Sequence, residues 1–163
     1  MVLNETFRFE AAAPTVKRAF LRTPEKIQLR ARAQLYKWTN RPLLGPTGIT
    51  PWWSFVESTR LPSGALAEGF RVAEERAARL GKPHREFARA RAAISDQFDN
   101  SMSDLLVVTL NEPVWGFAGQ ASGQPEFRDD QADLRHVILI GGAWQVWIPN
   151  LTSRHVTALP VRG

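Results

Sequence analysis

The chain contains no cysteine among its 163 residues, and this absence limits how it can fold. Without disulfides or zinc–thiolate sites, a packed apolar core must supply the stability. A chain of this length buries roughly 70% of its accessible surface on folding, which is sufficient for one core. We therefore predict a single domain over residues 1–163, with a basic helical N-terminal part (1–34) and a core (35–163).

Residue periodicity predicts both helices and strands. Pro24 favours a short helix over residues 24–34, and apolar residues at helical spacing predict helices over 63–80 and from Pro83 to about Phe98. The segments rich in aromatic and β-branched residues predict strands. They are residues 35–38, 51–59, 105–110, 114–121, 136–142, 144–149 and 153–161. Helices followed by late strands indicate an α+β fold, a mostly antiparallel sheet with helices on one side.

Positive charge is concentrated in the first quarter of the chain. Residues 1–41 hold nine Lys or Arg and three acidic residues, whereas the rest hold twelve and thirteen. The basic stretch 14–41 favours a polyanionic partner such as nucleic acid, anionic lipid or a nucleotide's phosphates, and a solvated face is the alternative. No apolar run approaches the roughly 18 residues of a membrane span, so we predict none. The first residues lack the pattern of a secretory signal.

Standard catalytic motifs are missing from the sequence. It has no Walker loop, HExxH, GxSxG or dinucleotide GxGxxG. His84, His136 and His155 lack the spacing of metal ligands, so we expect structural histidines and no metal site. Tryptophan occurs six times. The tryptophans are either core residues or, for Trp52 and Trp53 after a Pro/Gly-rich loop, a stacking platform for a planar ring.

Residues 35–42 read LYKWTNRP, an apolar-Tyr-Lys strand followed closely by Arg-Pro. This segment resembles the opening strand of the cholera and pertussis toxin class of ADP-ribosyltransferases, whose Arg holds the phosphates of NAD. Lys37 stands at the position of that Arg. The class then places a Ser-Thr-Ser strand end before a helix. Ser58-Thr59 looks like this feature, and Ser54 in PWWS is a rival for the same place.

Two later segments extend the resemblance. Residues 105–122 are similar to the next strand of the class and the turn after it. Residues 141–150 read GGAWQVWIPN and resemble the last signature, in which a catalytic Glu is followed by apolar residues and Pro. Gln145 stands at the position of this Glu. NAD-hydrolysing necrotizing toxins likewise carry a Gln on a Gly-Gly strand.

The resemblance implies an ADP-ribosyltransferase-like fold that binds NAD and transfers ADP-ribose or hydrolyses NAD. It implies catalytic roles for Gln145 and Ser58. The residues implied to contact NAD are Lys37, Arg41, Trp52, Trp53, Ser54 and Thr59. The expected partners are NAD and a protein target in a host or competitor cell. The chain would act as a secreted effector or toxin, or in the cytoplasm.

Two departures from the class affect the chemistry. Lys in place of Arg loses the bidentate grip on phosphate, and Gln in place of Glu loses a carboxylate that would stabilise the ribosyl cation. Arg41 is an alternative cation, and Glu57, Glu112, Glu126 or Asp133 are alternative carboxylates. Two other functions compete: a nucleic-acid-binding module through residues 14–41, and a non-catalytic interaction domain with Trp anchors.

Overall fold

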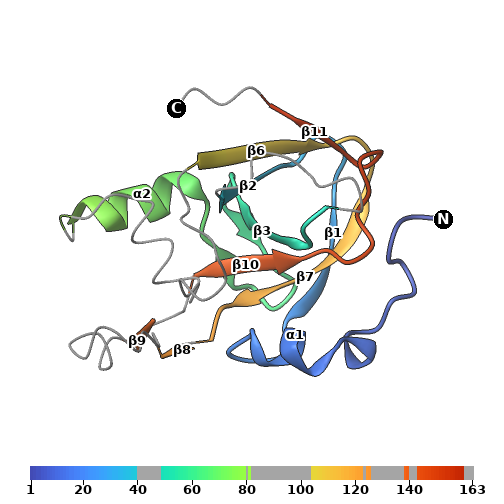
Figure 1. Ribbon diagram of the computed structural model, residues 1–163, viewed down its shortest axis with the longest axis horizontal. Helices are drawn as coiled ribbons and strands as arrows, with labels where there is room; N and C mark the ends of the chain where they lie inside the picture. The colour runs from blue at the N-terminus through green and yellow to red at the C-terminus, as the bar shows by residue number, and fades with distance from the viewer. Residues whose placement is uncertain are drawn as a thin grey trace, which may run out of the picture.

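The computed structural model describes residues 1–39, 49–79, 81, 104–122, 124–125, 138–139 and 143–159. Its elements are η1 (Phe9–Ala11), α1 (Pro14–Arg18), β1 (Glu25–Leu29), β2 (Gln34–Thr39), β3 (Trp52–Phe55), β4 (Thr59–Arg60), β5 (Leu66–Ala67), α2 (Phe70–Arg79), β6 (Asp104–Leu110), β7 (Val114–Gln120), β8 (Gln124–Pro125), β9 (Ile138–Leu139), β10 (Trp144–Trp147) and β11 (Val156–Ala158). Within these residues, a seven-stranded sheet has the order β1-β7-β10-β3-β2-β6-β11, and β4-β5 and β8-β9 form two short pairs (Figure 1).

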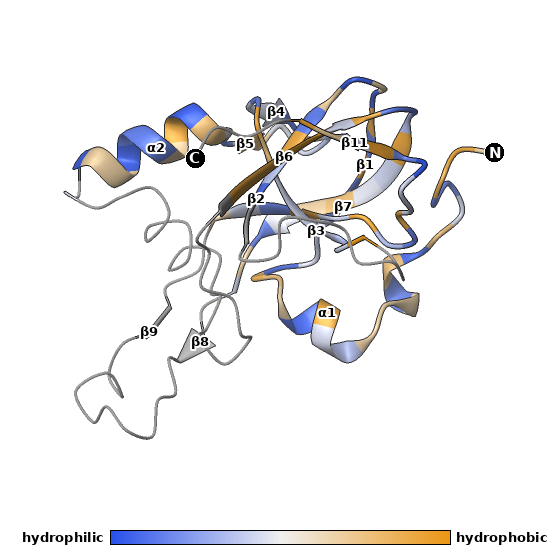
Figure 2. Cartoon of the chain, turned by 45° about the horizontal axis from the view of Figure 1, so that its top comes forward, coloured by the Kyte–Doolittle hydropathy of each residue, from blue (hydrophilic) through white to orange (hydrophobic). Residues whose placement is uncertain are grey.

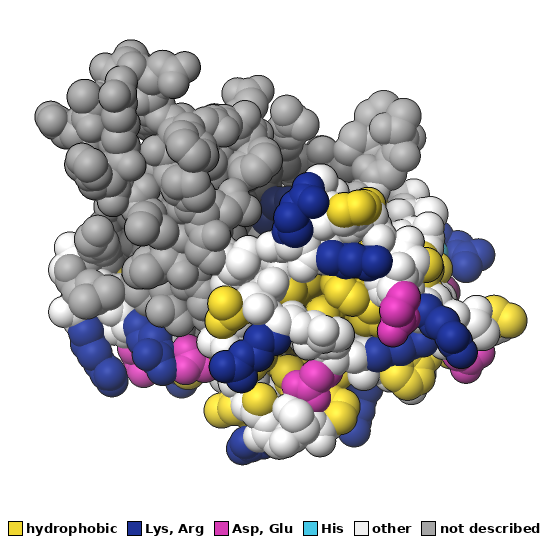
Figure 3. All heavy atoms as spheres, turned by 90° about the horizontal axis from the view of Figure 1, so that it is seen from below, with side chains coloured by type: hydrophobic (Ala, Val, Ile, Leu, Met, Phe, Trp, Pro, Cys, Tyr) yellow, Lys and Arg dark blue, Asp and Glu magenta, His cyan; other side chains and the backbone are white. Residues whose placement is uncertain are grey.

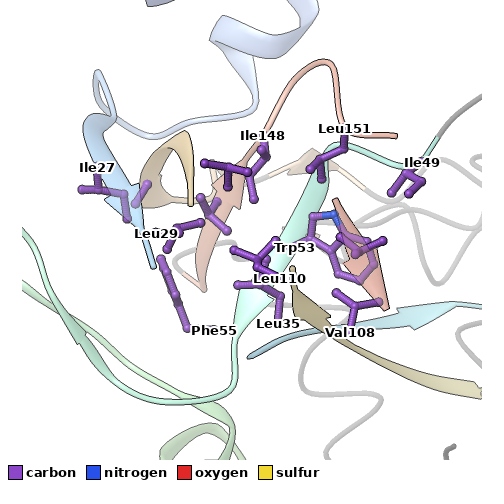
Figure 4. Packing of buried hydrophobic residues seen from close by; sticks show 14 of the residues in the cluster. Ile27, Leu29, Leu35, Ile49, Trp53, Phe55, Val108, Leu110, Ile148 and Leu151 are labelled. Carbon is purple, nitrogen blue, oxygen red and sulfur yellow. The ribbon is translucent and has the colours of Figure 1, made fainter. Parts of the chain in front are cut away.

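The large sheet curves around the main core. Ile27 of β1 and Val156 of β11 come from opposite ends of the sheet, yet they belong to one buried cluster. Adjacent strands contribute alternate residues to this concave side, among them Leu35, Trp53 and Val146. Figure 4 shows Trp53 in the middle of this packing, and it is 2% exposed. Burial in this core therefore determines which side chains of these strands point inward and which point to the outer face of the sheet.

A second, smaller cluster lies on the outer face of the sheet. Residues 1–24, here called the N-terminal segment, run along this face and carry α1 (Figure 1). The segment brings its aromatic residues against those of the strands. The cluster consists of Ala12, Phe20, Phe117 and Trp147, with Phe7, Phe9, Val16 and Trp52 packed around it. Burial of these large rings holds the segment on the sheet.

The predicted α+β class is wrong, because the described residues form a β-rich fold. The sheet has seven antiparallel strands, whereas α1 has five residues and α2 has ten. Figure 2 shows α2 projecting from the sheet, and Ala77 is its buried residue. Within the part of the chain that the structure describes, helices therefore do not cover one side of the sheet as expected. No helix among the described residues is long and apolar enough to cross a membrane.

The helix predicted over residues 24–34 is also wrong, because most of this segment is strand β1. Ile27 and Leu29 are buried while Gln28 is exposed, which is the alternation of a half-buried strand. All five residues of β1 pair with β7. Tertiary pairing therefore outweighed the helix-entry signal of Pro24. In contrast, the strands predicted at the positions of β2, β3, β6, β7, β10 and β11 are confirmed, although their boundaries differ from the predicted ones.

The helix predicted over 63–80 begins later than expected, at Phe70. Residues 59–67 instead form the β4–β5 hairpin, whose turn contains Gly64 at a φ of 93°. This left-handed conformation suits glycine and ends any helix started at Ser63. Ser63 binds Glu25 through its backbone N–H (2.7 Å) and its hydroxyl (2.6 Å). The helix predicted from Pro83 lies outside the described residues.

We expect Gly69→Ala to lower the free energy of unfolding by about 1–3 kcal/mol, as overpacking does. A Cβ at Gly69 would lie 2.5 Å from the Val56 carbonyl oxygen and 2.6 Å from the Ser58 nitrogen. These are backbone atoms of the turn after β3, so this turn and the chain entering α2 would have to separate. Gly116→Ala is the comparison variant and should cost less, because a Cβ there would lie 3.0 Å from the Ile148 and Val146 side chains and 3.2 Å from the Trp147 carbonyl oxygen, all of them farther away than the atoms at Gly69. Urea unfolding that shows equal losses for both variants would contradict this prediction.

Candidate functional site

Three polar side chains lie in a row on the outer face of strands β2, β3 and β10. The register pairs Tyr36 with Ser54. Continuing the β3–β10 register from Trp53 and Val146 by one residue places Gln145 beside Ser54 on the other side. Because side chains alternate between the faces of a sheet, all three project from the same face. We call Tyr36, Ser54 and Gln145 the polar row.

Tyr36 is the most deeply buried member of the polar row. It is 6% exposed, and Phe70 at the start of α2 packs edge-on against its ring at 4.9 Å. Burial raises the pKa of Tyr36 to about 12, although a hydrogen bond with the Ser54 side chain acts in the opposite direction. The phenol therefore stays protonated at neutral pH. The row supplies neutral hydrogen-bonding groups and no charge.

Gln145 and Trp52 connect the polar row to the N-terminal segment. The Gln145 amide Nε2 donates to the Ala19 carbonyl at 3.1 Å. Trp52 is half-buried and packs between Phe20, with centroids 5.5 Å apart, and Trp147, at 6.3 Å. The N-terminal segment thus borders the row on one side, and α2 borders it through Phe70. An aromatic surface and three polar groups adjoin on this part of the sheet.

Lys37 and Trp53 lie on the opposite face from the polar row. Lys37 follows Tyr36 in β2 and pairs with Leu106, which is in the main core. Its Nζ donates to the Thr50 hydroxyl at 2.8 Å. The Trp53 indole N–H donates to the Thr50 carbonyl at 2.8 Å. Trp53 is therefore a core residue, and Lys37 anchors the chain entering β3 at the rim of the core.

The other predicted site residues lie beyond the row. Ser58 is exposed after β3, and its hydroxyl accepts the Gly69 N–H at 2.9 Å. The Thr59 hydroxyl donates to the Glu57 carbonyl at 3.0 Å. Both bonds stabilise the turns around β4. Arg41 lies outside the described residues. Of the predicted residues, the structure brings together Trp52, Ser54 and Gln145.

The described carboxylates that could take the role of a Glu at position 145 lie away from the polar row. Glu57 is exposed in the turn after β3. Glu112 lies 3.3 Å from His155 Nε2 and 3.5 Å from Arg154. His155 is 4% exposed, and its Nδ1 accepts the Thr152 N–H at 3.0 Å. Glu126 and Asp133 lie outside the described residues. In the described part of the chain, no group of three His, Asp or Glu side chains could hold a metal ion.

The basic stretch 14–41 is divided between two places. Lys17, Arg18 and Arg22 are exposed on and after α1, whereas Arg30 and Arg32 follow the other end of β1. Figure 3 shows Lys and Arg side chains spaced around apolar surface on the underside of the molecule. Nucleic-acid binding through these residues stays a prediction.

Sequence reasoning gave no role to Tyr36 or Ala19. Tyr36 was predictable in part, because strict alternation in β2 places it on the opposite face from Lys37. The Ala19 carbonyl carries no sequence signal, because any residue supplies one. Its contact with Gln145 spans 126 positions and depends on how the N-terminal segment folds back.

Comparison with known proteins assigns no family to the chain. No protein-family model matches it, and no curated protein matches it in sequence. A solved structure of Tse6 in complex with Tsi6 resembles it with a TM-score of 0.44 and 10% identity, over 98% of this chain and 93% of that chain. Likeness at this level shows neither a shared family nor a shared activity.

Proposed function

We propose that the chain binds NAD at the polar row and cleaves it there, releasing nicotinamide. The observation that carries this proposal is the adjacency of β2, β3 and β10, in the order β10-β3-β2. These strands hold three of the segments that resemble ADP-ribosyltransferases, and β10 lies far from β2 and β3 in sequence. Their outward residues Ser54 and Gln145 lie side by side next to Trp52. This is the placement that the rival alignment, with Ser54 in the polar position, requires.

The chemistry of NAD fits the groups at this place. The nicotinamide ring of NAD is a planar cation, and the part of the Trp52 ring that Phe20 and Trp147 leave exposed attracts it. The ribose hydroxyls need hydrogen-bond partners, which Ser54 and Gln145 can provide. In hydrolysis, the bond between the ribose carbon and the ring nitrogen breaks and its electron pair leaves with nicotinamide. Water then bonds to the ribose carbon and gives up a proton.

Titration with NAD, followed by tryptophan fluorescence and by an assay of released nicotinamide, tests the proposal. We expect Ser54→Ala and Gln145→Ala each to weaken NAD binding about tenfold, the effect of losing one good hydrogen bond. Ser153→Ala is the matched control, because Ser153 is exposed in the turn before β11. We expect it to bind NAD as the unaltered chain does. Absence of NAD binding by the unaltered chain would refute the proposal.

Transfer of ADP-ribose to a protein of a host or competitor cell is the further reaction to test. The acceptor replaces water in the same bond-forming step, so the polar row serves both outcomes. Incubating the chain with labelled NAD and candidate proteins distinguishes transfer from hydrolysis. The contribution predicted for Arg41 concerns the diphosphate and requires its own variant, whereas Lys37 lies on the core side of β2, away from the polar row.

A further inference from the structure

The bond between Gln145 and Ala19 joins two parts of the fold that are distant in sequence. Gln145 lies on β10 in the middle of the sheet, and Ala19 lies on the N-terminal segment just after α1. The Ala19 carbonyl also accepts the Ser122 N–H at 3.0 Å, and the Ser122 hydroxyl donates to the Arg18 carbonyl at 2.6 Å. Leu21 continues this attachment, since its N–H donates to the backbone carbonyl of Gln120 at 2.9 Å.

The chemistry of this contact fixes the orientation of the Gln145 side chain. A backbone carbonyl can only accept hydrogen bonds, so the group that faces Ala19 must be the amide NH₂. The amide oxygen is therefore turned away from Ala19. A glutamate at this position would place an ionised oxygen against the carbonyl, with no hydrogen to share. The bond thus requires a donor, which a glutamine provides and a carboxylate does not.

From this geometry we infer that Gln145 is a positioning residue that holds the N-terminal segment as a fixed wall beside the polar row. Through the same bond, the segment holds the amide oxygen of Gln145 in one orientation, as an acceptor for a donor group of the ligand. The role of the amide oxygen toward a ligand rests on the proposed function. The attachment of the N-terminal segment through the Gln145–Ala19 hydrogen bond, here called the tether, does not. It follows that glutamine is the side chain this site needs, and that Gln145→Glu loosens the segment.

Hydrogen–deuterium exchange of Leu21 and its neighbours, measured without NAD, tests the tether. At neutral pH we expect Gln145→Glu to speed exchange in residues 19–22 about tenfold, because a hydrogen bond is lost and an ionised group faces a carbonyl. Gln28→Glu is the matched control, since Gln28 is exposed on β1. We expect its exchange in residues 19–22 to match the unaltered chain. The comparison uses the full chain.

Acidification separates the donor role from a role of side-chain shape. Below about pH 4 the introduced carboxyl group becomes protonated and regains a hydrogen to donate. We expect exchange in Gln145→Glu then to approach that of the unaltered chain at the same pH. Gln145→Met, which has similar length and no N–H, should show faster exchange at both pH values. Gln145→Met also tests the hydrogen bond to Ala19 if Gln145→Glu fails to fold.

Two results would overturn the inference. One is equal exchange in Gln145→Met and the unaltered chain. The other is fast exchange in Gln145→Glu that acid does not slow, while Gln28→Glu remains unaffected. Neither result depends on NAD. Failure of the chain to bind NAD would refute the proposed function and leave the tether standing, so the two failures are distinguishable.

Discussion

Trp53→Ala is expected to lower the free energy of unfolding by about 3–5 kcal/mol, the cost of removing a large aromatic side chain from a packed core. Trp53 is 2% exposed and lies among residues from β2, β6 and the segment after β10, including Leu35, Val108 and Leu151 (Figure 4). The variant also leaves the Thr50 carbonyl without its indole donor. Urea unfolding measures the loss directly.

The control for this prediction is Trp53→Phe, which keeps an aromatic ring and removes the N–H. It should cost clearly less, because most of the buried volume remains. A loss below about 1 kcal/mol for Trp53→Ala, which is typical of exposed positions, would contradict the placement of Trp53. It would instead favour the expectation that Trp53 forms part of an exposed stacking platform.

Alkaline pH is expected to destabilise the fold through Tyr36. The pKa of Tyr36 is raised to about 12 in the folded state, against about 10 in an unfolded chain. Below pH 10 the phenol is protonated in both states and the stability is unaffected. Between about pH 10 and 12 the unfolded chain loses this proton and the folded chain retains it, so unfolding is favoured. A shift of this size corresponds to about 3 kcal/mol.

The sequence makes this prediction unusually easy to measure. Tyr36 is the single tyrosine of the chain, so the absorbance of tyrosinate reports this residue alone. Tyr36→Phe cannot ionise, and its unfolding free energy should fall less between the two pH values. A tyrosinate midpoint near the ordinary value, while the fold persists, would show that Phe70 and the sheet do not bury the phenol.

Most strands were predictable because they carry strong local signals. The apolar run of β6 and the aromatic, β-branched residues of β10 identify strands wherever they pack. β1 was missed because Lys26 and Gln28, which face outward, are good helix formers. Their alternation with Ile27 and Leu29 becomes decisive only when β7 pairs with them. The turn at Gly64 likewise prevented the predicted helix from starting at Ser63.

The candidate site was predictable as a set of strands and less so as a set of side chains. The resemblance identified β2, β3 and β10, and these strands are neighbours in the sheet. It also assigned Lys37 to the site, but alternation in β2 places Lys37 on the core side. Which residue of a strand faces the site depends on register and curvature. These are set by pairing between distant segments.

The N-terminal segment has a consequence for how the chain is made. The Asn4 amide donates to the carbonyls of Pro149 at 2.7 Å and Trp115 at 3.1 Å. A ribosome synthesises Asn4 long before it reaches Pro149, so the first residues emerge without their partners. Phe7 and Phe9 both pack against Phe117 and Trp147, so their contacts are completed only after Trp147 has been added. Such late closure slows folding and leaves nascent chains open to aggregation.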